Sequence, residues 1–106
     1  MSIPMTGQQG PTTAGTAVSF TTRTDMAGTF LIAPSAANAG TYCFVGNDGA
    51  GDVTSANSAV LKKDTNSIVV TVNDLRQVYV DSDTDGDKVW WMRVMGQVAM
   101  IAPPAV

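Results

Sequence analysis

Four of the chain's nine carboxylates stand in one seven-residue stretch, DSDTDGD. Asp81, Asp83 and Asp85 alternate with short polar residues and are followed by Gly86, which is how an EF-hand calcium loop begins. Such a loop also needs a bidentate acidic residue at its twelfth position, and Met92 stands there. The three aspartates are therefore a candidate calcium site only if another loop adds oxygens. The alternative is a solvated turn in which Asp and Gly make local hydrogen bonds.

Outside this stretch, the chain has few side chains for catalysis. It contains no histidine, and all nine acidic residues are aspartate. Most general acid–base and nucleophilic arrangements are therefore unavailable, and we expect no enzyme, no catalytic residue and no cofactor other than calcium. The single Cys43 lies between Tyr42 and Phe44, which predicts a buried, unreactive thiol without a disulfide.

The charge pattern limits the classes of partner that the chain can be expected to bind. The net charge is −3, and the longest basic run is Lys62-Lys63, which argues against nucleic acid. No run approaches the roughly 18 apolar residues of a membrane span. Residues 1–15 contain no apolar segment typical of a secretory signal, so we expect synthesis in the cytoplasm.

The composition favours β-structure. The chain has 13 valines and 13 threonines but three leucines and no glutamate. Branched side chains suit a pleated sheet, whereas leucine and glutamate are good helix formers. We therefore predict an all-β chain.

Short apolar or alternating segments recur about every ten residues, with turn residues between them. This spacing predicts a single small antiparallel β-sandwich, jelly-roll-like, of seven or eight strands. We expect an extended arm over residues 1–15, the sandwich over 16–101 and a tail over 102–106. The segments expected as strands are residues 16–23, 29–33, 41–45, 53–55, 67–72, 77–80, 88–94 and 97–101.

The aspartate-rich stretch is expected to join residues 77–80 and 88–94 as a β-hairpin. In the second arm Trp90 and Trp91 must point to opposite faces. One tryptophan can enter the core, and the other needs further cover, from the chain itself, from another subunit or from a bound glycan.

Both ends of the chain favour contact with a partner. The first fifteen residues are rich in Gly, Pro, Ser and Thr, and we expect a neighbouring subunit to hold them. The last nine residues are uncharged and apolar, so exposing them would promote aggregation. The residues expected at an interface with another subunit or another partner protein are Met5, Pro11, Trp90, Trp91, Met95, Met100, Ile101 and Pro103.

From Tyr42 to Trp91 the sequence resembles the head-decoration, or cement, proteins of tailed bacteriophages. The similarity lies in the strand ending YCFVG, the segment VTSAN, the strand SIVVTV, the string NDLRQVYVD and the loop DTDGDKVWW. The resemblance implies a structural virion protein, often a homotrimer, on the outer capsid surface, bound across subunits of the major capsid protein. The alternative is a tail or fibre module that binds host glycan with the help of calcium.

Overall fold

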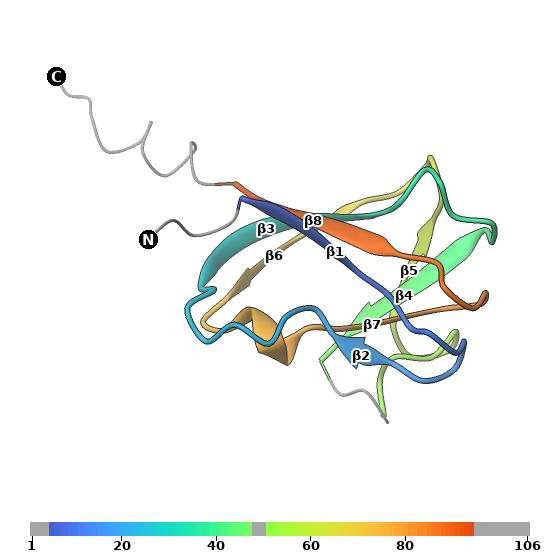
Figure 1. Cartoon of the computed structure of the whole chain (residues 1–106), viewed down its shortest axis with the longest axis horizontal. Coiled ribbons are helices and arrows are strands. Elements are labelled where there is room, and N and C mark those ends of the chain that lie inside the picture. The colour runs from blue at the N-terminus through green and yellow to red at the C-terminus, as the bar shows by residue number, and fades with distance from the viewer. Residues whose placement is uncertain (1–4, 48–50, 95–106) are drawn as a thin grey trace, which may run out of the picture.

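The computed structural model describes residues 5–47 and 51–94 of the chain. They form two four-stranded antiparallel sheets that pack face to face (Figure 1). The first sheet has the order β1-β8-β3-β6, with β1 (Thr6–Gln9), β8 (Val89–Arg93), β3 (Gly28–Pro34) and β6 (Ile68–Val72). The second has the order β2-β7-β4-β5, with β2 (Val18–Ser19), β7 (Tyr79–Ser82), β4 (Tyr42–Gly46) and β5 (Ala59–Lys62). A single 3-10 turn, η1 (Leu75–Gln77), leads into β7.

The strand order is that of an eight-stranded jelly roll. Every connection crosses from one sheet to the other except β4–β5, which stay together in the second sheet. All six strand pairings are antiparallel. The prediction of an all-β sandwich is therefore confirmed, with the jelly-roll order as well.

The core forms between the sheets because each inner strand turns alternate apolar side chains inward. Phe30 and Ile32 of β3 and Trp91 of β8 are buried there, and Cys43 and Val80 face them from the second sheet. The Phe30 and Trp91 rings meet edge to face, with centroids 5.5 Å apart and planes at 88°. Burial of side chains of this size contributes about 1.5–3 kcal/mol each, so these strands hold the sandwich together.

The predicted hairpin over residues 77–94 is wrong. Although β7 and β8 are consecutive, β7 pairs with β2 and β4, and β8 pairs with β1 and β3. The intervening residues 83–88 therefore bridge the two sheets instead of closing a hairpin. Val80 and Trp91 are both buried in the one core, and placing their strands in opposite sheets lets both side chains reach it.

The first fifteen residues also differ from the expected arm. Within them, Thr6–Gln9 form β1 at the edge of the first sheet, and Pro11 is fully buried. Gly7 makes this pairing feasible, because a Cβ there would lie 2.7 Å from the Trp91 ring. The chain's own sheet thus holds residues 6–9, where we expected a neighbouring subunit.

The other strand predictions vary in accuracy. Those over residues 29–33, 41–45, 67–72 and 88–94 are confirmed as β3, β4, β6 and β8. The strand expected over 16–23 shrinks to β2, the one over 77–80 is shifted to β7, and residues 53–55 form no strand. Strand β5 was not assigned from the sequence, and residues 97–101 and 102–106 lie outside the described residues. In the described ranges, no helix has the length and apolar character needed to cross a membrane.

Candidate interaction surfaces

The carboxylate of Asp87 is buried and accepts hydrogen bonds from the backbone of the same chain. Its side chain is 6% exposed, and its two oxygens accept hydrogen bonds from the backbone N–H groups of Ala39, at 2.9 Å, and Gly40, at 2.8 Å. A Cβ added to Gly40 would lie 2.9 Å from Asp87 Oδ2, so glycine permits this close approach. Asp87 therefore links residues 83–88, which connect the two sheets, to the turn before β4.

Two of the predicted calcium ligands have similar backbone partners. Asp81 Oδ1 accepts hydrogen bonds from Gly15 N, at 3.0 Å, and from Ser82 N, at 2.8 Å. Asp85 Oδ1 accepts one from Ala14 N at 2.7 Å. Through these hydrogen bonds, both carboxylates hold the segment between β1 and β2 close to β7 and to residues 83–88, which connect β7 to β8.

The third predicted ligand, Asp83, is exposed, and its Oδ1 accepts a hydrogen bond of 3.2 Å from Thr84 Oγ1. Across residues 5–47 and 51–94, no three or more His, Cys, Asp or Glu side chains are grouped so as to hold a metal ion. The described geometry gives these aspartates a structural role, and calcium binding stays a prediction.

Asn38 completes this end of the sandwich. Its side chain is buried and bonds both backbone groups of Lys88: Nδ2 donates to the carbonyl at 2.8 Å, and Oδ1 accepts from the N–H at 2.7 Å. The amide thereby acts as a strand residue would and anchors the start of β8. We call the carboxylates of Asp81, Asp85 and Asp87, together with Asn38, the polar clamp.

Cys43, which lies next to the polar clamp, has an unreactive thiol. Burial raises the pKa of its thiol to about 12, and the negative charges of Asp87, Asp83 and Asp81 act in the same direction. The Asn38 side chain donates a weak hydrogen bond to Cys43 Sγ at 3.5 Å, which opposes the rise in part. Since the thiolate is the reactive form, this cysteine is a core side chain, as its sequence neighbours predict.

The side chains of the two tryptophans lie on opposite faces of β8, as their adjacent positions in a strand require. Trp91 is buried against Phe30, whereas Trp90 lies half-buried on the outer surface of the first sheet. Trp91 therefore belongs to the core, and its place among the predicted interface residues is wrong.

Around Trp90, the outer surface of the first sheet is apolar. Met92 of β8 stands opposite Leu31 of β3, which stands opposite Val69 of β6, so the three form one row across the sheet. Met92 is 39% exposed and Val69 is 60% exposed. We call Leu31, Val69, Trp90 and Met92 the apolar face.

The apolar face is hollowed beside Trp90. A depression of about 340 Å³ lies between Leu31 and Trp90 on one side and the turn at residues 64–67 on the other. A recess next to an aromatic side chain can accept a side chain of a partner protein, and such contacts carry much of the energy at protein interfaces.

Of the other residues predicted at an interface, Met5 is exposed, at 51%, close to the end of β8. Pro11 is buried within the chain, so its side chain is not available to a partner. Four more lie outside the described residues: Met95, Met100, Ile101 and Pro103. Sequence reasoning missed Leu31, Val69 and Met92, although the alternation within their own strands already placed them opposite to the buried positions.

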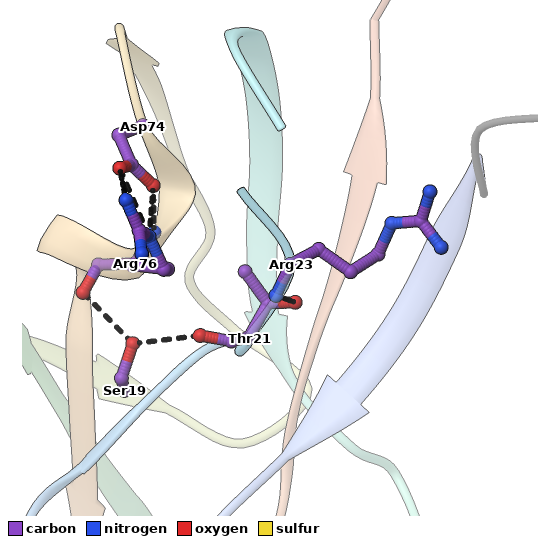
Figure 2. A network of polar contacts seen from close by, with 5 residues as sticks. All are labelled: Ser19, Thr21, Arg23, Asp74 and Arg76. Carbon is purple, nitrogen blue, oxygen red and sulfur yellow. Dashed lines mark hydrogen bonds and ion pairs between the residues drawn. The ribbon is translucent and has the colours of Figure 1, made fainter. Parts of the chain in front are cut away.

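At the other end of the sandwich, a cluster of polar side chains surrounds η1 (Figure 2). The Arg76 guanidinium lies against the Asp74 carboxylate, with Nη2–Oδ2 at 2.6 Å and Nε within 3.0 Å of both oxygens. The Ser19 hydroxyl lies 2.8 Å from the carbonyl oxygen of Arg76 and 3.1 Å from that of Thr21, and its one hydrogen can be donated to either or shared between them. The Arg23 guanidinium points away from this group.

This cluster borders an open cleft of about 600 Å³. Its polar and aromatic lining comes from Asn47, Asp74, Arg76, Gln77 and Tyr79. The hydrogen bonds from Arg76 hold the pKa of Asp74 below its usual value, so Asp74 is ionised near neutral pH. The pair is exposed and contributes little to stability, but it fixes the guanidinium in one orientation.

Comparison with protein-family models, with curated proteins and with solved structures gave no match to this chain. The resemblance to phage decoration proteins therefore rests on the sequence pattern from Tyr42 to Trp91.

Proposed function

We propose that this protein is a structural virion component that decorates a bacteriophage capsid by binding across subunits of the major capsid protein. The observation that carries the proposal is the apolar face, which presents Trp90, Met92, Leu31 and Val69 on a rigid sheet. The resemblance from Tyr42 to Trp91 supports the same assignment. The mechanism is binding without chemistry.

The form of the apolar face suits such a role. Its side chains project from three neighbouring strands that the core fixes on the opposite side, so contact with a partner orders few additional groups. Repeated around a symmetric shell, many modest contacts of this kind would fasten neighbouring capsomers. Particles without the protein should keep their geometry but resist heat and internal pressure less well.

Co-sedimentation with empty heads of the phage that encodes the protein tests the proposal. The wild-type chain should sediment with heads at a fixed stoichiometry, and Met92→Lys should bind at least tenfold more weakly, because a charge would be buried against the capsid. Val60→Lys is the matched control, since Val60 is 41% exposed on β5 in the second sheet. Recovery of the wild-type chain entirely in the supernatant would refute capsid decoration.

A glycan-binding tail or fibre module is the second candidate, and the cleft beside η1 favours it. Planar amide, carboxylate and guanidinium groups next to the Tyr79 ring can hydrogen-bond hydroxyls and stack on a sugar face. In this reading the site is the cleft, whereas the sequence had suggested an exposed tryptophan or the aspartate-rich loop.

A glycan array separates the two candidates. Binding to one glycan class, lost in Tyr79→Ala and Gln77→Ala but kept in Met92→Lys, would support the adhesion module. Binding to heads without any array signal would support decoration.

A further inference from the structure

A groove runs along β6, between the two sheets. It has a volume of about 360 Å³, and β6 lines it with the inward side chains of Ile68, Val70 and Val72. Val45 and Val78 face them from the other side. The three β6 side chains are only partly buried, so the core remains open along this side.

The same strand forms an edge of its sheet. In the described part of the chain, β6 pairs with β3 on one side, and its other side carries no strand. Val69, on the outer surface of β6, is the most exposed large hydrophobic residue described. An apolar groove next to a free edge is the geometry that accepts an added strand, since backbone groups pair with the edge and alternate side chains enter the groove.

The chain carries a segment with the chemistry that this groove requires. Residues 97–101, QVAMI, are uncharged, mainly apolar and expected to be a strand. They follow directly after the end of β8, where Val94 N donates to Thr29 O at 2.8 Å, level with the last residues of β6. Strand β8 therefore ends at the same end of the sheet as β6.

The segment that fills the groove belongs to a second copy. A strand added outside β6 lies three strand spacings from β8, or about 14 Å. Residues 95–97 span at most about 10 Å when fully extended, and β8 runs parallel to β6 because both are antiparallel to β3. Within its own chain the segment would spend most of its length on crossing β3 and β6 and reversing direction, so it could not pair along β6.

We propose that residues 97–101 of one copy add as a strand to the β6 edge of another copy and close its groove. Each copy donates one segment and accepts one, so the exchange closes either between two copies or around a ring. A ring of three copies would match the expected trimer. The inference does not depend on capsid binding, because it concerns the free protein.

Light scattering on the full-length protein tests the exchange. The wild-type chain should be an oligomer, whereas Ala99→Pro should dissociate at least tenfold more readily, because proline removes a backbone donor from the added strand. Ala105→Pro is the matched control beyond the segment and should keep the wild-type mass. Near-ultraviolet circular dichroism of the Trp91 core checks that each variant is folded.

Hydrogen exchange locates the contact. Amide protons of β6 should exchange at least tenfold more slowly in the wild type than in Ala99→Pro, while those of β5, the neighbouring free edge, should not change. Three outcomes would overturn the inference: a monomeric wild type, an Ala99→Pro variant with wild-type mass, or β6 protection that appears only when capsids are added. The last would assign the groove to a capsid segment.

Discussion

Asp87 of the polar clamp and Trp90 of the apolar face are three positions apart in the sequence, yet the two groups of side chains have opposite environments. In the polar clamp, Asp81, Asp85 and Asp87 turn their carboxylates toward backbone N–H groups of the same chain. On the apolar face, Met92 and Val69 expose side chains that could have been buried. The charged groups thus have hydrogen-bond partners within the chain, whereas the apolar groups remain exposed.

This contrast shows why a dense charge cluster is a weak guide to function. A carboxylate that accepts two charge-assisted hydrogen bonds inside the fold stabilises loops and has less capacity for a ligand. An isolated exposed methionine or valine means little, but a row of them across neighbouring strands covers an area that water solvates poorly. Position in the sheet therefore decides which side chains stay exposed more than residue type does.

The largest expected effect is on the polar clamp. Replacing Asp87 by Ala removes the two hydrogen bonds that its buried carboxylate accepts from the partly buried N–H groups of Ala39 and Gly40, and should lower the free energy of unfolding by about 3 kcal/mol. Urea denaturation measures it. Asp83→Ala, in the same loop but exposed, should change stability by less than about 0.5 kcal/mol. Equal losses in the two variants would contradict the clamp.

Asn38→Ala should cost about 2 kcal/mol, because it removes both hydrogen bonds to the Lys88 backbone. Asn66→Ala is the control, since Asn66 is exposed and accepts one bond from Lys62 N at 3.2 Å. Thermal unfolding of the two variants gives the comparison. If Asn38→Ala melts no lower than Asn66→Ala, the anchoring role of Asn38 is wrong.

The buried Cys43, next to the polar clamp, should make the free energy of unfolding depend on pH in the alkaline range. The pKa of its thiol rises from 9.0 to about 12 on folding, so between these values the unfolded chain loses a proton that the folded chain keeps. Stability is therefore unaffected below pH 9 and falls as the pH rises above it, by about 1 kcal/mol at pH 10. Cys43→Ala should lack this component, and the difference between the two pH profiles isolates it. Parallel profiles would show that the thiol titrates normally.

Calcium should have the smallest effect. Because Asp81 and Asp85 already accept backbone hydrogen bonds, we expect the same melting temperature, within about 1 °C, in calcium and in chelator. A clear rise in calcium that Asp83→Asn and Asp85→Asn abolish would restore the cation site.

The sequence allowed much of the fold to be predicted, and physical reasons explain the rest. Alternation in residues 29–33 and 67–72 was strong enough to identify β3 and β6. The pairing of β7 with β8 was predicted wrongly, because a short polar loop between two strands has the same pattern whether it closes a hairpin or crosses between sheets. The core decides between them, since Val80 and Trp91 are buried in the same core from opposite sheets.

The interaction surfaces were harder to foresee. Trp90 was selected as an interface candidate from its own strand, but Met92 was not, and Leu31 and Val69 join them only through the register across β8, β3 and β6. The hydrogen-bond partners of the aspartates also could not be predicted from the sequence, since Asp85 and Ala14 are 71 positions apart in the chain. Non-local pairing fixes both sites, and no local pattern encodes it.

Titration of phage heads with Met92→Lys and Asp83→Asn, beside the wild type, tests the central claim most directly. We predict that Met92→Lys needs at least tenfold more protein to fill the same number of sites, whereas Asp83→Asn fills them as the wild type does. The reverse order, with Met92→Lys bound normally and Asp83→Asn lost, would move the binding surface to the aspartate-rich loop and contradict the account.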